Sequence, residues 1–190
     1  ETTHGVSWHM IEGGVDEGDI LASRSFDITN SDTALTLNTK AYEAAIASFG
    51  DVLDQLESGD LKRIKQDQSQ RSYHTLADRP SGYGLLDFTK PAEELARLVR
   101  ALDHGSYWNP LCAPKFRAKD QIWLAQSARV VEGSGAPGTV LKETSDHLTI
   151  ACGTGALELE DITRICGTPV APVVVALEGD VLPLTQDFAE

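Results

Sequence analysis

The N-terminal part of the chain contains the sequence His4-Gly5-Val6-Ser7-Trp8-His9-Met10-Ile11-Glu12-Gly13-Gly14-Val15-Asp16-Glu17-Gly18-Asp19-Ile20, whose pattern is typical of a β-hairpin. Apolar side chains at Val6, Trp8 and Met10 alternate with polar ones, which is the period of a half-buried β-strand. A second strand-like run covers residues 20–28. The pattern therefore predicts two strands that are joined by a turn at residues 12–19.

This turn is the first candidate site of the chain. Its eight residues hold three glycines and four carboxylates. Glycine permits positive φ and the close approach of a ligand to the backbone, whereas carboxylates must stay in water or meet a partner. The residues alone leave two interpretations open, a binding or catalytic turn and an ordinary solvated hairpin loop.

Two helices are predicted by their apolar periodicity. The first begins at Ser31 or Asp32, either of which can cap it, and ends at Gly59. Its predicted apolar stripe comprises Tyr42, Ala45, Ile46, Phe49, Val52, Leu53 and Leu56. The second begins near Pro91 with Thr89 as its cap, and its stripe comprises Leu95, Leu98, Val99 and Leu102.

The second half of the chain is predicted to be a small antiparallel β-structure. Short β-like runs cover residues 121–131, 139–143, 148–151 and 156–159, and a further run covers 172–177. Glycine-rich turns separate these runs, which is the spacing typical of a small barrel.

The charge of the chain limits the classes of partner that it can bind. The chain carries 29 acidic against 16 basic side chains, a formal net charge of −13, so that its field repels a polyanion and nucleic acid is an unfavourable partner. A local basic group of Arg97, Lys115, Arg117 and Lys119 could dock an acidic carrier.

The spacing of the three cysteines suggests buried thiols rather than a disulfide frame or a metal site. Because the sequence has no apolar run of bilayer length and no signal peptide, we expect a cytoplasmic protein without a membrane anchor.

The stretch 4–20 resembles the second signature of the folate-dependent formyltransferases, in which a Gly-Val-Thr-like strand runs into a turn of the form Asp-x-Gly-Asp-Ile. Residues 85–88 and 91–101 are similar to the first strand and helix of the C-terminal domain of methionyl-tRNA formyltransferases. The pieces 122–123, 136–141 and 148–155 resemble the barrel strands of that domain, in the same order. The likeness covers about residues 4–166.

The resemblance implies an α+β chain: the end of an α/β formyltransferase lobe, with strands and a long helix, then a small antiparallel OB-like β-barrel with a leading helix. The expected divisions are 1–62 for the lobe, 63–84 for a linker, 85–170 for the barrel domain and 171–190 for an extension or the start of a further domain. Because both ends of the sequence look cut, we expect covalently continuous domains upstream and downstream.

The resemblance also implies a reaction and a set of site residues. The family transfers a formyl group from 10-formyltetrahydrofolate to an amine with a trio of Asn, His and Asp, and the Asp corresponds to Asp16. The folate pocket is expected at Glu12, Gly13, Gly14 and Val15, where main-chain groups bind the pterin ring, and Asp19 is expected to fix the turn by accepting backbone N–H bonds.

Two features depart from or refine this pattern. The family's Asn-x-His-Pro-Ser-Leu-Leu-Pro segment does not occur here, and no histidine of the chain is assigned to catalysis. The run 102–115 resembles formyltransferase-related domains of polyketide and nonribosomal peptide assembly lines, with Tyr107 and Trp108 as an expected apolar plug between helix and barrel.

Three functions remain open. The acidic charge favours an amine on a small molecule or an aminoacyl group on a carrier domain of a biosynthetic multidomain protein. The alternatives are a methionyl-tRNA formyltransferase and a non-catalytic linker or binding module derived from the family.

Overall fold

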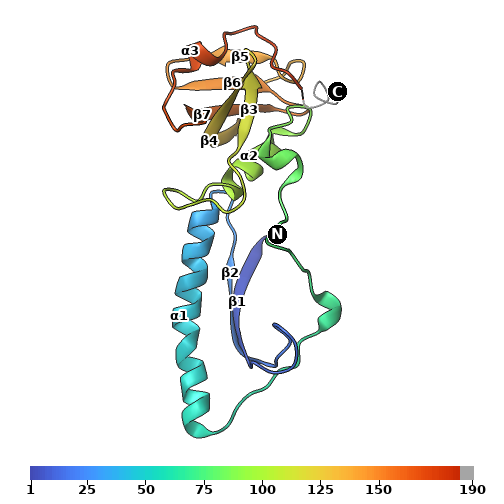
Figure 1. The fold of residues 1–190 in the computed structure, drawn as a ribbon, viewed down its shortest axis with the longest axis vertical. Coiled ribbons are helices and arrows are strands. Elements are labelled where there is room, and N and C mark those ends of the chain that lie inside the picture. Colours follow the sequence, from blue (N-terminus) through green and yellow to red (C-terminus); the bar gives the residue numbers. More distant parts are fainter. Residues whose placement is uncertain (185–190) are drawn as a thin grey trace. The chain divides into compact units, whose positions relative to one another are not determined.

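Strands β1 (Thr3–His9) and β2 (Ile20–Asp27) form an antiparallel hairpin, as predicted (Figure 1). The computed structural model describes residues 1–184 and divides into two units, Glu1–Leu76 and Ala77–Glu190. In the hairpin, Thr3 pairs with Asp27 and Trp8 with Ala22, and a bulge between Trp8 and His9 shifts the register beside the turn. This bulge re-aims the last side chains of β1.

Helix α1 (Ala34–Ser58) follows the hairpin. Its N-cap is Thr33, whose side chain exchanges hydrogen bonds with Thr36 in a capping box, so that the predicted cap at Ser31 or Asp32 was wrong. Asp32 instead accepts hydrogen bonds from the backbone N–H of Thr29 at 2.7 Å and from Lys40 at 2.6 Å. Gly59 closes the helix in the left-handed conformation, with φ 71°, as predicted.

The face that α1 buries differs from the predicted stripe. The buried residues are Ala44, Ser48 and Val52, and Trp8 of β1 covers this face by donating from Nε1 to the Ser48 Oγ at 3.1 Å. Most of the predicted stripe is exposed: Tyr42, Ile46, Phe49, Leu53 and Leu56. The helical period therefore marks an apolar face that residues 1–184 leave largely uncovered.

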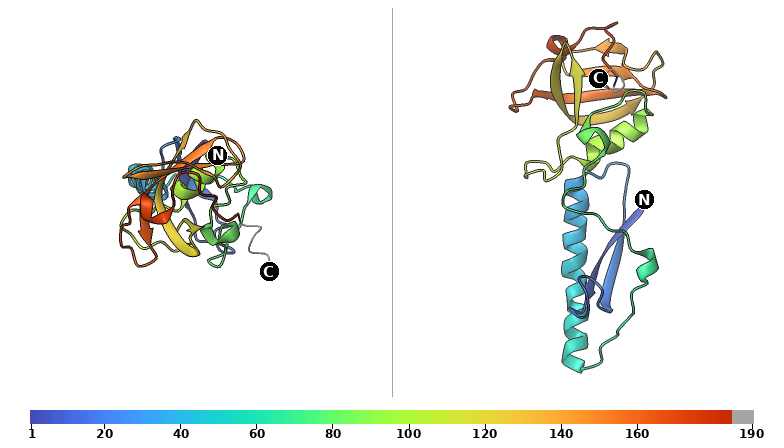
Figure 2. Two further views of the ribbon diagram at one scale, coloured as in Figure 1. Left: turned by 90° about the horizontal axis from the view of Figure 1, so that it is seen from above. Right: turned by 45° about the vertical axis from the view of Figure 1, so that its right-hand side comes forward.

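In the second unit, five strands form one antiparallel sheet in the order β3-β4-β7-β6-β5. They are β3 (Lys115–Ala118), β4 (Gln121–Val131), β5 (Val140–Glu143), β6 (His147–Ala151) and β7 (Ala156–Arg164). The sheet curls, and α2 (Ala92–Ala101) packs against it (Figure 2). The largest fully buried side chains of this core include Phe88, Phe116, Leu148, Ile150, Leu157 and Leu159. The chain is thus an α+β protein, as predicted.

Several local predictions for this unit were wrong. Thr89 does not cap α2, because its hydroxyl bonds to Asp87 at 2.7 Å. Residues 172–177 do not form a strand, since Pro172–Val175 is a short helix, α3, with proline in its first turn. Strand β3 was missed. The expected extension at 171–190 lies partly outside the described residues, which end at 184.

Tyr107 and Trp108 do not form the predicted plug. Their exposed fractions are 73% and 83%. The loop that carries them is instead fixed by Asn109, whose side-chain amide donates to the carbonyls of Leu102 and Cys112 at 2.8 and 2.7 Å.

The cysteines are free thiols in three different environments. Cys152 is buried, and burial raises the pKa of its thiol to about 11. Cys112 is half-buried, and Cys166 is exposed, contrary to the prediction of buried thiols. Within residues 1–184, no helix is both long enough and apolar enough to span a bilayer.

Candidate active site

The turn between β1 and β2 has a specific backbone path. Gly13 has φ 71° and Asp16 has φ 60°, so both lie in the left-handed region, which aspartate tolerates better than most side chains. At Gly18 a Cβ atom would lie 1.8 Å from the carbonyl oxygen of Met10, so that only glycine fits. The Met10 N–H donates to the Asp19 carbonyl at 3.0 Å and closes the base of the turn.

Residues 63–71 fasten the turn from the other side of the same unit. The Arg63 guanidinium binds the carboxylates of Glu12 and Asp19, the latter at 3.0 Å, and these bonds, first that with Glu12, raise the pKa of Arg63. Ile64 exchanges backbone hydrogen bonds with Ile20 at 2.8 and 3.0 Å.

Two further side chains of this segment hold main-chain atoms of the turn. The Gln66 amide donates to the carbonyls of Asp16 at 3.0 Å and Gly18 at 2.6 Å. Arg71 approaches Glu17 at 3.5 Å and the Val15 carbonyl at 3.4 Å. The turn is therefore held in shape although residues 12–17 are exposed.

The Asp16 side chain points toward an imidazole. Its Oδ1 lies 3.5 Å from Nε2 of His9, and the side chains are 73% and 28% exposed. The Nδ1 of His9 lies 2.9 Å from the Met10 carbonyl oxygen, which can only accept, so that Nδ1 must carry a proton. The Nε2 edge of the ring therefore faces the Asp16 carboxylate, while the Nδ1 edge is held by the main chain.

The structure brings the predicted residues together on this one turn. Glu12, Gly13, Gly14 and Val15 form its outer arc, with the Gly14 N–H donating to Glu17 at 3.2 Å. Asp19 lies at its base, but its carboxylate binds Arg63 rather than the expected backbone N–H groups.

Sequence reasoning missed His9. The sequence predicts His9 within a strand, and the alternation of that strand does not by itself indicate a contact with Asp16. The usable signal was its place at the end of β1, since a hairpin brings the end of its first strand next to the residues of its turn.

The predicted basic group of the second unit is partly tied to the main chain. Lys115 Nζ donates to the Tyr83 carbonyl, and Lys119 Nζ donates to the Val174 carbonyl at 3.1 Å. Both side chains are therefore fixed rather than free to reach outward.

The sequence of this chain is similar to those of known proteins. Residues 82–175 match the family model described as the formyl transferase C-terminal domain. A methionyl-tRNA formyltransferase of Ectopseudomonas mendocina (strain ymp) is 34% identical over 167 residues, which are 88% of this chain and 51% of that protein. The chain spans about half the length of the curated relatives it matches.

Two solved structures share the fold. HypX from Aquifex aeolicus, in complex with tetrahydrofolic acid, superposes with a TM-score of 0.65 at 20% identity, over 87% of this chain and 28% of that chain. The N-formyltransferase from Helicobacter canadensis, in complex with folinic acid and dTDP-3-aminofucose, superposes with a TM-score of 0.62 at 17% identity, over 86% of this chain and 57% of that chain. The chain belongs to the folate-dependent formyltransferase family and corresponds to the C-terminal part of those proteins.

Proposed function

We propose that this chain is part of an enzyme that transfers a formyl group from 10-formyltetrahydrofolate to an amine. The observation that carries the proposal is the Asp16 carboxylate, which is exposed on a fastened turn 3.5 Å from the His9 imidazole, in a chain of the formyltransferase family. The tetrahydrofolic acid and folinic acid bound to the two structural neighbours support a folate as the donor.

The turn fits a pterin ring that is recognised through the main chain. Gly13 and Gly14 carry no side chain that could cover the backbone, and both residues are exposed. Glu12 and Val15 would complete this contact surface, while Asp19, held by Arg63, would keep its base in place. When bound there, a 10-formyl folate would supply the formyl group that is transferred.

Asp16 is placed to accept the proton that the acceptor amine loses. An amine loses a proton when it becomes a formamide, and an exposed carboxylate can take that proton directly or through one water. His9 would hold the carboxylate in position from the strand side. We assign the Asn and His of the family trio to chain upstream of residue 1.

The exposed face of α1 supports that assignment. Ile46 and Phe49 are 77% and 43% exposed, and a helix gains most of its stability by burying such a face. We propose that upstream chain completes the lobe of 1–62 and covers this face, while 63–84 link the lobe to the domain at 85–170 and 171–190 lead out of it.

The acceptor that suits the charge is an amine on a small molecule or an aminoacyl group on a carrier domain, because a chain of net charge −13 repels a polyanion. The names of the curated relatives favour a second candidate, methionyl-tRNA. A gel shift of the full polypeptide with initiator tRNA at increasing salt separates the two, since a tRNA enzyme should bind in a strongly salt-dependent manner. A third candidate, a non-catalytic module, requires that the full polypeptide lack the Asn and His segment.

The test is Asp16→Asn in the full-length polypeptide. Consumption of 10-formyltetrahydrofolate with a panel of amines that includes methionyl-tRNA should fall about 100- to 1,000-fold, while folinic acid binding stays within a few-fold. The matched control is Asp51→Asn, which changes an exposed carboxylate of α1 outside the turn and should retain most activity. Turnover of the Asp16→Asn variant near that of the control would remove Asp16 from the mechanism.

A further inference from the structure

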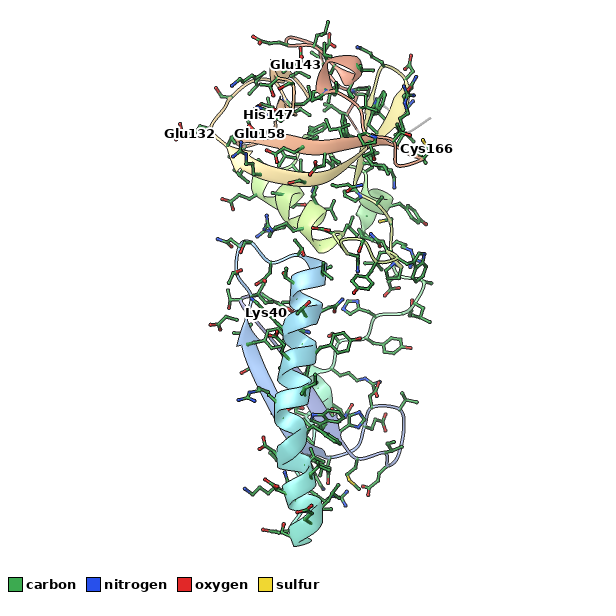
Figure 3. The ribbon with its side chains drawn as sticks, turned by 90° about the vertical axis from the view of Figure 1, so that its left-hand side faces the viewer. Lys40, Glu132, Glu143, His147, Glu158 and Cys166 are labelled. Carbon is green, nitrogen blue, oxygen red and sulfur yellow. The ribbon has the colours of Figure 1, made fainter. Side chains whose placement is uncertain are left out.

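A second cluster of ionisable side chains lies on the C-terminal sheet, on the face opposite the core. Glu158 and Glu160 of β7 point to one side, because residues two apart in a strand share a face, whereas Leu157 and Leu159 point into the core. The register places His147 of β6 opposite Glu160. Figure 3 shows His147 and Glu158 close together on this sheet.

The distances within this cluster match those of metal ligands. Among residues 1–184, His147, Glu158 and Glu160 each offer one ligand atom, and these three atoms lie within 4.8 Å of one another. The His147 Nε2 lies 3.2 Å from the Glu158 Oε2. Bonds of about 2.0–2.2 Å from a zinc ion hold neighbouring ligand atoms roughly 3.0–3.6 Å apart, so that the cluster needs to contract by only about 1 Å.

The contact of His147 with Glu158 is not a hydrogen bond. The Nε2 atom is buried and, within the described chain, makes no hydrogen bond despite its short distance to the carboxylate. An imidazole nitrogen that faces a carboxylate oxygen without an aligned proton is unfavourable unless a cation lies between them. This buried nitrogen is therefore available as a ligand for a cation that lies between the imidazole and the carboxylate.

Arg129 of β4 orients the carboxylates of this cluster but does not neutralise both of them. Its guanidinium binds the Oε1 of Glu158 and approaches the Oε1 of Glu160 at 3.7 Å. The Glu158 carboxylate is thereby held with its other oxygen toward His147. One cation against two carboxylates leaves a net negative charge, and partners of this kind orient metal ligands in known sites.

We propose that His147, Glu158 and Glu160 bind a divalent transition-metal ion, with Zn²⁺ as the best match. A neutral imidazole with carboxylates favours zinc over magnesium or calcium, which prefer all-oxygen surroundings. Three protein ligands leave a fourth position for water or another small ligand. The sequence gives no motif for this site, because its ligands come from two paired strands.

The test is a titration of the 190-residue chain with zinc chloride, followed by calorimetry and thermal unfolding. We expect one ion per chain and a rise of the melting temperature of about 5 to 10 °C at a hundredfold excess over Kd. His147→Gln and Glu160→Gln should each weaken binding at least tenfold. These two variants carry the test, since Glu158 is buried and its replacement could unfold the sheet.

Two controls separate this site from adventitious binding. His4→Gln and Cys166→Ser remove an exposed histidine and an exposed thiol elsewhere and should leave zinc binding unchanged. With Co²⁺ as probe, the visible spectrum should lack the strong charge-transfer band of a thiolate ligand. The proposal is overturned if zinc produces no heat and no thermal shift, if His147→Gln binds like wild type, or if Cys166→Ser abolishes binding.

Discussion

Helices α2 and α1 differ in how much of their apolar surface is buried. Of the ten residues of α2, four are buried, Ala92, Leu95, Ala96 and Val99, whereas α1 buries three of its 25, and one of these is a serine. The apolar face of α2 thus has its partner, the curled sheet, within the chain. Among residues 1–184, the face of α1 has only a two-stranded hairpin beside it, and such a hairpin is marginally stable alone.

The sharpest test of this difference compares the removal of one large apolar side chain in each unit. Leu159→Ala removes a fully buried side chain from the sheet and should lower the free energy of unfolding by about 3 kcal/mol. The matched Ile46→Ala on α1 should change it by less than about 0.5 kcal/mol in the same chain. Urea unfolding followed by circular dichroism measures both. Equal shifts would contradict the comparison, because they would mean that the face of α1 is covered after all.

A smaller effect is expected from the N-cap of α1. Since this helix has little packing to support it, its ends should contribute visibly to its stability. Thr33→Ala removes the capping box and should cost about 1 kcal/mol, measured as a loss of amide-exchange protection in the first turn. Thr39→Ala is the control, because the Thr39 hydroxyl donates to the Leu35 carbonyl within the same helix and has no part in the cap, and it should be neutral.

The smallest effect is a pH dependence at the same helix end. The hydrogen bonds of Asp32, first that from Lys40, hold its pKa well below the ordinary value of 3.8. A depressed folded-state pKa contributes stability that is present above the unfolded pKa and is lost as the pH falls through the folded one. Thermal melts of α1 between pH 5 and pH 2 should therefore show a loss that Lys40→Met reduces. An unchanged acid profile in that variant would show that the Asp32 pair has no role.

Local signals predicted the elements whose stabilising contacts lie close by in the sequence. The hairpin followed from the alternation around Trp8, the end of α1 from Gly59, and β4 from its unbroken run at 121–131. The short strand β3 was missed because it has only four residues, so that its alternation of Lys115 and Arg117 with buried Phe116 and Ala118 is too short to indicate a strand.

Contacts between distant residues could not be predicted in the same way. The contact of His9 with Asp16 depends on the bulge that ends β1, and the fastening of the turn depends on Arg63, which lies 44 residues after Asp19 in the chain. The period of α1 correctly marks an apolar face, but a period does not tell whether its partner lies in the same chain. For that reason the predicted stripe includes Ile46, which is exposed.

The contact between Gly18 and Met10 gives a criterion for judging distant relatives. Any side chain at this position would place its first carbon 1.8 Å from a carbonyl oxygen, so that a homologous sequence with another residue there must close its hairpin along a different path. Alignments that retain the aspartate but replace this glycine should therefore not be used to transfer an active-site assignment. In this chain the path of the turn depends on an atom that glycine lacks.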